Sequence, residues 1–358
     1  MRHVADFPYA NETTPKILID EIKDDSAWNR DSLSPEDWLI PLPEACMAEF
    51  DEVVRCLQKH PRPIQSLTPA TFSLTACAEV MSKVRVNLQH RVGFAVLDRV
   101  PVDRYSLTEN KAIYRLLAMM LGQVVSQKWD GTTLYDVKDS GQALGYGVRR
   151  SVTNLGQDFH TDGGWLQMPP EVIGLFCLQP AQEGGLSRCA SLMTAHNEMR
   201  RRHVNLLSRL YRPFFWDRQA EHGADEARFS WHPVYQYDGH TLTARYYEDY
   251  IFNGYKLAGE SLDQKGVEAL ETMRSLIDAP ENWVEFRLEK GQIEFVNNEQ
   301  LAHARTAFID TDPPHLHRHM VRLWNRSQGV LHIENQERPQ MMSNPQHDNL
   351  EGSSLPWN

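Results

Sequence analysis

The chain has 358 residues, 41% hydrophobic and 24% charged, which is enough apolar material for a full core and excludes collagen-like, disordered and coiled-coil classes. Its formal net charge of −11 argues against nucleic acid or an anionic membrane as a partner, because both are bound by concentrated Lys and Arg. No apolar run is long enough to cross a bilayer, and the first residues lack the basic-then-apolar order of a signal peptide.

The cysteines argue for a reducing compartment. They are odd in number, scattered, and never spaced as CxxC, which excludes a Cys-based zinc site and a disulfide framework. We therefore expect a cytoplasmic protein. The five cysteines are Cys46, Cys56, Cys77, Cys177 and Cys189.

The first half of the chain predicts few regular elements. About 70 residues at the start are rich in Asp, Glu and Pro and are typical of irregular chain with short helices. The apolar run 92–97 predicts a strand. Ser106 and Glu109 have the spacing of a capping box and predict a helix that runs to about residue 121.

The second half predicts many short strands with helices between them. Asp238-Gly239 is a strong hairpin signal, and Glu183-Gly184-Gly185 predicts a turn. No dinucleotide or P-loop glycine motif is present. The pattern favours a β-sandwich or jelly roll over a parallel α/β sheet. We expect strands over 172–178, 234–237, 242–247, 283–288, 293–296 and 320–324, and helices over 194–210 and 261–277.

The sharpest local motif is Phe159-His160-Thr161-Asp162. On a strand, residues two apart project to the same face, so His160 and Asp162 would present an imidazole and a carboxylate together. These are two of the three ligands of the 2-His-1-carboxylate triad of non-haem iron enzymes. Alone, the motif is weak, since such a triplet also arises by chance.

Two His-x-Glu pairs compete with this motif. His196 and Glu198 fall inside the predicted helix, where residues two apart diverge around the axis, so a solvated helix face is expected. His332 and Glu334 have acceptable spacing but no downstream strand to supply further ligands.

A third ligand should come from a distant strand. His303, which follows the apolar strand and the turn at Asn297-Asn298, is the candidate, with a purely structural histidine as the alternative. His315, His317 and His319 lie near two prolines in a polar stretch and are expected at the surface.

Two arginines on the last strand suggest an anion. Arg318 and Arg322 share a strand face, which is unfavourable unless carboxylates lie opposite, since guanidinium groups bind carboxylates bidentately. Ser187, after the glycine turn, would add a hydroxyl donor to the same anion.

In order and spacing, these motifs match one family. With them the chain resembles the TauD/TfdA-type Fe(II)/2-oxoglutarate-dependent dioxygenases of the clavaminate synthase-like group, from about residue 90 to residue 326. The motifs are Gly93-Phe94, Gly122-Gln123, Phe159-His160-Thr161-Asp162, Gly184-Gly185-Leu186-Ser187, Asn297-Asn298 before His303, and Arg318 with Arg322.

The resemblance implies a mainly β fold with inserted helices, in which a double-stranded β-helix (jelly roll) is flanked by helices. Expected units are an N-terminal extension packed on the core (1–90), the dioxygenase domain (91–335) and a C-terminal tail (336–358). His160, Asp162 and His303 are then expected to hold Fe(II). Arg318, assisted by Ser187, is expected to bind the far carboxylate of 2-oxoglutarate, and Arg322 to meet the cosubstrate or an anionic group of the substrate.

The implied reaction is hydrogen abstraction from an unactivated C–H of a small molecule, coupled to O2 consumption and decarboxylation of 2-oxoglutarate to succinate and CO2. Hydroxylation is the expected outcome. Halogenation is not expected, because Asp162 keeps the acid that halogenating relatives lack. The sequence does not decide whether the chain forms a homo-oligomer with further copies of itself.

Substrate contacts are expected just before the His-x-Asp motif. If the arginines there and Arg322 face the pocket, the substrate is anionic or amino-acid-like. Each of these side chains has a plain structural alternative as a surface cation or core aromatic. The candidates are Arg149, Arg150, Asn154, Gln157, Arg322, Trp324, Tyr246 and Tyr247.

Two other classes remain as alternatives. A hydrolase could hold Zn(II) on the same three residues, but it would need no paired arginines for a dicarboxylate. A catalytically silent jelly-roll binding protein would need neither the metal nor the anion residues.

Overall fold

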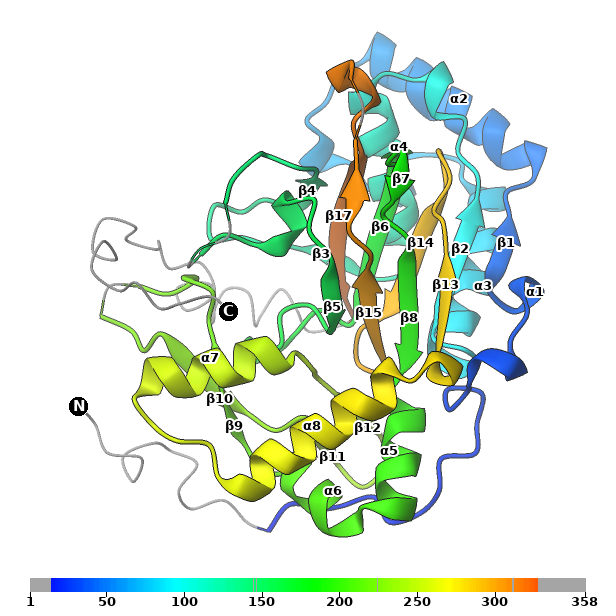
Figure 1. The fold of residues 1–358 in the computed structure, drawn as a ribbon. Helices are drawn as coiled ribbons and strands as arrows, with labels where there is room; N and C mark the ends of the chain where they lie inside the picture. The colour runs from blue at the N-terminus through cyan, green and yellow to red at the C-terminus, as the bar shows by residue number, and fades with distance from the viewer. Residues whose placement is uncertain (1–13, 144, 146, 224, 311, 328–358) are drawn as a thin grey trace.

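Two antiparallel sheets face each other at the centre of the molecule (Figure 1). The computed structural model describes residues 14–143, 145, 147–223, 225–310 and 312–327. The larger sheet has seven strands and the smaller has four, which is the arrangement expected of a jelly roll. Strand β1 differs from the rest of the larger sheet because it pairs with β2 in parallel.

The strands of the two sheets come from distant parts of the chain. The larger sheet runs in the order β1 (Leu39–Pro41), β2 (Phe94–Asp98), β14 (Ile293–Asn297), β6 (Val172–Gln179), β17 (His319–Arg326) and β3 (Gln123–Val125), with β4 (Leu134–Val137) also on β17. The smaller runs in the order β13 (Trp283–Phe286), β8 (Ser187–Ser191), β15 (Leu301–Arg305) and β5 (Gln157–His160). A short pair joins β7 (Glu183–Gly184) to β16 (Phe308–Ile309).

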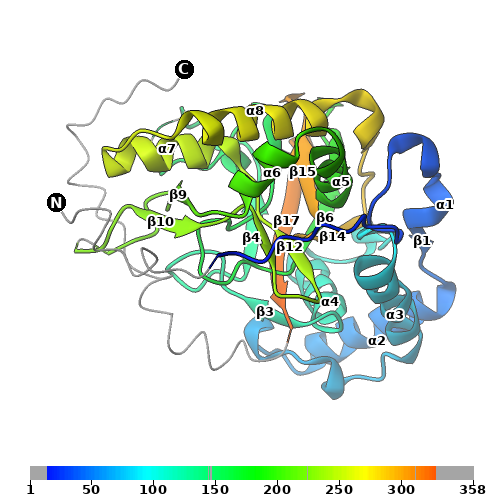
Figure 2. The same cartoon turned by 90° about the horizontal axis from the view of Figure 1, so that it is seen from below.

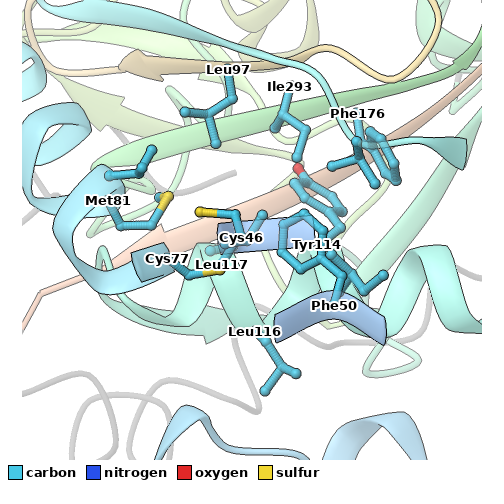
Figure 3. Packing of buried hydrophobic residues seen from close by; sticks show 14 of the residues in the cluster. Cys46, Phe50, Cys77, Met81, Leu97, Tyr114, Leu116, Leu117, Phe176 and Ile293 are labelled. Atoms are coloured by element: carbon cyan, nitrogen blue, oxygen red, sulfur yellow. The ribbon is translucent and has the colours of Figure 1, made fainter. Parts of the chain in front are cut away.

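Helices α2 (Glu44–Lys59), α3 (Thr75–His90) and α4 (Leu107–Met119) cover the outer face of the larger sheet. The predicted capping box is present, with the Ser106 hydroxyl accepting from the Glu109 amide and the Glu109 carboxylate accepting from the Ser106 amide. Figure 3 shows the apolar cluster beneath these helices, where Phe50 and Tyr114 lie near Phe176 of β6.

A second group of elements covers the smaller sheet on the opposite side (Figure 2). Here Ala190 of β8 and Ala302 of β15 belong to the same buried cluster as Leu210 and Met273. The group comprises α5 (Leu192–Arg202), α6 (Val204–Leu210), α7 (Glu248–Ala258), α8 (Gln264–Asp278) and the hairpins β9 (Phe214–Asp217) with β10 (Phe229–His232) and β11 (Tyr235–Tyr237) with β12 (Leu242–Ala244).

The interior between the sheets is lined by alternate residues of the central strands. On β17, Val321 and Leu323 pack with the helices, whereas Met320 and Trp324 lie in clusters between the sheets. Arg322 therefore points into the barrel, because residues two apart share a face.

Three expectations about the elements need correction. The N-terminal segment is less irregular than predicted, since α2 is a 16-residue helix with Phe50 and Val53 buried, besides the short α1 (Pro35–Trp38). The helix expected over 194–210 is two helices, because the backbone at His203 leaves the helical region. The hairpin strand expected to reach Tyr247 ends at Ala244.

The proposed unit boundaries at residues 90 and 335 stay predictions. The tail 336–358 lies outside the described residues. Within the described residues, no helix combines the length and the apolar character needed to span a membrane.

Candidate metal centre and active site

Three side chains converge at one mouth of the barrel. The register of β5 and β15 places His160 opposite His303, with ring centroids 4.3 Å apart. Oδ1 of Asp162 lies 3.4 Å from Nε2 of His160 and 3.9 Å from Nε2 of His303. The three ligand atoms lie within 4.8 Å of one another, so this cluster can hold a metal ion.

The local geometry differs from the expected strand. Strand β5 ends at His160, and the chain leaves the sheet there, because the Thr161 amide donates to the carbonyl of Tyr246 in the connection between β12 and α7. Asp162 follows this turn and reaches the imidazoles from the end of the strand.

Both imidazoles are prepared for a metal. Nδ1 of His160 lies 2.9 Å from the Asp158 carbonyl, which can only accept, so Nδ1 carries the hydrogen and Nε2 keeps its lone pair. The Gln157 amide nitrogen lies 2.8 Å from that Nε2 and donates to it. Burial, with His160 nearby, lowers the pKa of His303 to about 3, so the ring is neutral at physiological pH.

The carboxylate of Asp162 is divided between two tasks. Its Oδ2 accepts from Nε1 of Trp324 at 2.8 Å and pairs with Nη1 of Arg322 at 3.0 Å. Oδ1 is the oxygen that faces the imidazoles. Burial raises the pKa of Asp162, but the Arg322 guanidinium and the two histidines outweigh it and hold the pKa well below its usual range.

The backbone of Asp162 is held by Asn298, which is buried. Oδ1 of the Asn298 side chain accepts from the Asp162 amide at 2.8 Å, and its Nδ2 donates to the backbone carbonyls of Asp162 at 2.9 Å and Pro170 at 2.8 Å. Asn298 belongs to one of the motifs in the sequence, but no role is predicted from that motif.

Two neutral imidazoles and one carboxylate on one side of the metal position are the donor set of Fe(II) oxygenases, in which the remaining coordination positions of the metal stay open. The same donors also suit catalytic zinc. Neighbouring charges must therefore decide between an oxygenase and a hydrolase.

Arg318 offers a site for an anion. It is 4% exposed, and its Nε and Nη1 are buried without a hydrogen-bond partner among the described residues. Its guanidinium lies over the Phe308 ring, 5.1 Å from the centroid. A Cβ at Gly185 would come within 3.3 Å of Nε, so glycine keeps the adjacent space open. Unpaired donors of this kind fit a carboxylate.

Arg322 is engaged differently, although it comes from the same strand. Besides Asp162, it donates through Nε to the Gln127 side-chain carbonyl at 2.7 Å. Nε2 of Gln127 also donates to the backbone carbonyl of Arg322, so Gln127 binds both the side chain and the backbone of this residue on β17. The sequence predicts no role for Gln127, since no motif links it to a residue 195 positions later.

Ser187 does not lie free for an anion as the sequence suggested. Its hydroxyl donates to Oε2 of Glu294 at 3.0 Å inside the barrel. Glu294 is 1% exposed, and burial raises its pKa to about 7. The sequence predicts no role for this acid, although it interrupts an apolar run.

An open hollow of about 330 Å³ adjoins two of the three ligands, His160 and Asp162. Among the predicted substrate residues, Arg149, Arg150, Gln157, Arg322 and Trp324 line it, and Trp165 and Tyr250 add aromatic surface. Asn154 is exposed and outside this lining, with its carbonyl accepting from the Phe308 amide. Tyr246 and Tyr247 line a neighbouring hollow, and the Tyr247 ring is tilted against the His160 ring with the centroids 5.1 Å apart.

Both arginines before the motif already have acidic partners. Nη2 of Arg149 lies 2.6 Å from Oε1 of Glu221, and Nη2 of Arg150 lies 3.6 Å from Oδ2 of Asp249. Neither arginine at the hollow is therefore a free cation, although the two acids lie outside the lining of the hollow. Glu221 has no sequence signal, because it belongs to a distant loop.

The competing histidines lie elsewhere. His196 is on α5 as predicted, but it is fully buried and bonded to the Tyr211 hydroxyl, so the expected solvated position is wrong for this residue. Glu198 pairs with Arg201 and Arg202. His332 and Glu334 lie outside the described residues.

The three histidines near the prolines are outside the metal cluster. His315 is exposed. His317 lies 3.7 Å from Asp312, and His319 bonds to Asp136 at 2.7 Å.

Comparison with known proteins decides the family. The family model described as "Taurine catabolism dioxygenase TauD, TfdA family" matches residues 62–324. The chain belongs to this family. It is therefore a 2-oxoglutarate-dependent dioxygenase, and iron, 2-oxoglutarate and O2 are confirmed as its cofactors by the family and the donor set.

Relatives in sequence are moderately similar. FR-33289 synthase of Streptomyces rubellomurinus is 26% identical over 315 residues, which cover 86% of this chain and 91% of that protein. The taurine hydroxylase-like protein SAT17 of Stachybotrys chartarum is 25% identical over 322 residues, 86% of this chain and 80% of that protein.

Solved structures share the fold. Asparagine oxygenase (AsnO) superposes with a TM-score of 0.60 at 16% identity, covering 80% of this chain and 92% of that chain. The non-haem iron oxygenase OrfP, in complex with Fe and alpha-ketoglutaric acid, gives 0.61 at 13% identity, covering 86% and 99%. The predicted jelly-roll fold is confirmed. Neither a zinc hydrolase nor a non-catalytic jelly roll is supported by the family.

Proposed function

We propose that this dioxygenase abstracts hydrogen from an unactivated C–H of a small, amino-acid-like molecule, with hydroxylation as the outcome. The reaction class follows from the family; the substrate and outcome are the proposal. The carrying observation is the cluster of His160, Asp162 and His303, together with Arg318, whose buried Nε and Nη1 have no partner among the described residues.

The protein residues have separate tasks in this proposal. His160, Asp162 and His303 hold Fe(II), whose bound chemistry activates O2 at the expense of 2-oxoglutarate. Arg318 binds the far carboxylate of 2-oxoglutarate. Arg322 and Trp324 hold the Asp162 carboxylate in one orientation, so that Oδ1 stays directed at the metal position.

The pairing of the arginines at the hollow supports an amino-acid-like substrate. A simple anion would need free cations, whereas Arg149 and Arg150 line the hollow already paired with acids next to it, so cationic and anionic groups lie close together. A zwitterion presents the complementary set. AsnO and OrfP, which share the fold, are described with hydroxyasparagine and hydroxy-L-Arg respectively.

We also propose a cytoplasmic location, supported by five cysteines that are all free.

The test is substrate-dependent succinate formation. Protein loaded anaerobically with Fe(II) and 2-oxoglutarate is exposed to O2 with a panel of free and N-modified amino acids. A productive substrate raises succinate formation above the substrate-free rate. His160→Ala and Asp162→Ala abolish this increase, whereas His315→Ala, at an exposed histidine, does not. Turnover with Zn(II) in the absence of 2-oxoglutarate would overturn the proposal.

The substrate class has its own test. Arg149→Gln and Glu221→Gln each leave one buried charge without its partner, so both raise the KM of an amino-acid substrate while the 2-oxoglutarate KM is unchanged. If both variants keep the wild-type substrate KM, this ion pair does not recognise the substrate.

A further inference from the structure

A carboxyl group lies inside the barrel beside the expected cosubstrate position. Glu294 is on β14, between Ile293 and Phe295, which pack outward against the helices. Its own side chain therefore points inward, where Ser187 donates to Oε2 at 3.0 Å and the Cys189 thiol donates to Oε1 at 3.4 Å. No cation closes an ion pair with Glu294 within the described residues.

Two features tie this acid to cosubstrate binding. Ser187 is the hydroxyl expected to assist Arg318, and in the structure it is bonded to Glu294 instead. Arg318 and Glu294 also interact electrostatically, and Arg318 has Nε and Nη1 still to be satisfied. A second carboxylate arriving at Arg318 would place two like charges in a dry interior, which is costly.

We propose that Glu294 is a positioning residue that takes up one proton when 2-oxoglutarate binds, and so switches the Ser187 hydroxyl from Glu294 to the cosubstrate carboxylate. The proposal rests on the function proposed above. It makes cosubstrate affinity depend on a group that contacts neither metal nor substrate.

Hydrogen-bond counting gives the switch its direction. A serine hydroxyl has one hydrogen to donate and can accept as well. When Glu294 is ionised, it can only accept, and Ser187 must donate to it. When Glu294 is protonated, its O–H donates to Ser187, and the serine hydrogen is released toward the anion on Arg318. The proton comes from solvent, and no bond other than O–H forms or breaks.

Among Glu294 and the titratable groups that interact with it, Glu294 is the group with a pKa near neutrality. Val96 and Leu175 flank it on the paired strands. Burial raises the pKa of Glu294 to about 7, with Ser187, Cys189 and Arg318 acting against it. Burial also raises the pKa of Cys189 and of Tyr114, the other acids that interact with it, well above their usual values.

Arg318 remains a cation, since burial lowers its pKa only to about 10. The positive charge of Arg318 opposes protonation of Glu294. A bound carboxylate neutralises that charge, so cosubstrate binding and proton uptake favour each other.

The experiment measures 2-oxoglutarate binding to the Fe(II)-loaded protein without O2, by calorimetry and by charge-transfer absorption. If only the protonated form binds, affinity weakens about thirtyfold between pH 6 and pH 8.5, from linkage with a group of pKa about 7. At pH 8.5, binding in buffers of different ionisation enthalpy shows uptake of close to one proton. This measurement needs no variant.

Glu294→Gln supplies the matched test, because its amide donates to Ser187 at every pH. We expect this variant to bind 2-oxoglutarate at pH 8.5 at least as tightly as at pH 6. Glu281→Gln, at an exposed glutamate, should keep the wild-type pH dependence. Any pH effect at the metal ligands is shared by all three proteins.

The outcomes separate the two proposals. No proton uptake at pH 8.5, or equal pH slopes for wild type and Glu294→Gln, would overturn the switch and leave the oxygenase assignment intact. If wild type and Glu281→Gln both fail to bind 2-oxoglutarate at every pH, the proposed cosubstrate site itself is wrong.

Discussion

Replacing Asn298 tests how the protein fixes its carboxylate ligand. Asn298→Asp keeps the size and the acceptor oxygen but removes both N–H donors, which reach the carbonyls of Asp162 at 2.9 Å and Pro170 at 2.8 Å. Those carbonyls then face a carboxylate in a buried position, since Asn298 is 1% exposed.

The magnitude follows from the lost hydrogen bonds. A buried polar group left unsatisfied costs about 1–3 kcal/mol, so two carbonyls should lower the free energy of unfolding by about 2–6 kcal/mol. The released loop also frees Asp162, and loss of such supporting contacts weakens metal binding by about 10- to 100-fold.

The assay compares Asn298→Asp with Asn297→Asp. Asn297 also donates from Nδ2, to the Leu88 carbonyl at 2.9 Å and to Oε1 of Gln300 at 3.2 Å, but it does not contact Asp162. Urea unfolding of the metal-free proteins should show that both variants are destabilised. Anaerobic Fe(II) titration at a temperature where both are folded should show weakened binding for Asn298→Asp alone. Equal loss of Fe(II) affinity in the two variants would refute the positioning role.

Three further changes have separate readouts. Arg318→Lys keeps the charge but loses the forked donors, so 2-oxoglutarate binding should weaken by more than about tenfold in anaerobic titration while Fe(II) binding is retained; unchanged affinity would place the carboxylate elsewhere. Gly174→Ala puts a Cβ onto the buried Tyr114 hydroxyl and should lower the unfolding free energy by about 1–3 kcal/mol in urea, whereas an unchanged midpoint would contradict this close packing. Burial lowers the pKa of His196 to about 4 from 6.5, so the unfolded chain binds a proton that the folded chain excludes, and stability falls as pH drops through this range. His196→Gln, which can still bond to Tyr211, should lose stability less steeply by up to about 1.4 kcal/mol per pH unit; identical slopes would mean that the ring is protonated in the fold.

The fold was readable from sequence wherever a local signal matched its tertiary setting. The Ser106 capping box and the Asp238-Gly239 hairpin are local, and both are present. The break at His203 was not readable, because the residues on both sides keep good helical periodicity and the change of direction serves packing against α8. The helix at residues 44–59 was obscured by its acidic and proline-rich surroundings.

The site divides in the same way. His160, Asp162 and His303 were found because ligand residues fall into a short motif and a family order. Gln127 and Glu294 were missed, since each acts through a contact more than 100 positions away in the chain. Local sequence patterns do not predict such long-range contacts, because the partners come together only in the fold.

The two arginines of the last strand show what the structure adds. In sequence, Arg318 and Arg322 are equivalent cations four positions apart, and either could bind an anion. In the fold, Arg322 is occupied by Asp162 and Gln127, so an anion there would have to displace an existing charge pair. Arg318 has buried donors without partners among the described residues, so an incoming carboxylate gains hydrogen bonds and displaces none. The cosubstrate is therefore expected at Arg318, and Arg322 is expected to orient the metal ligand Asp162. Substitution of Arg318 should then weaken 2-oxoglutarate binding, whereas substitution of Arg322 should weaken Fe(II) binding.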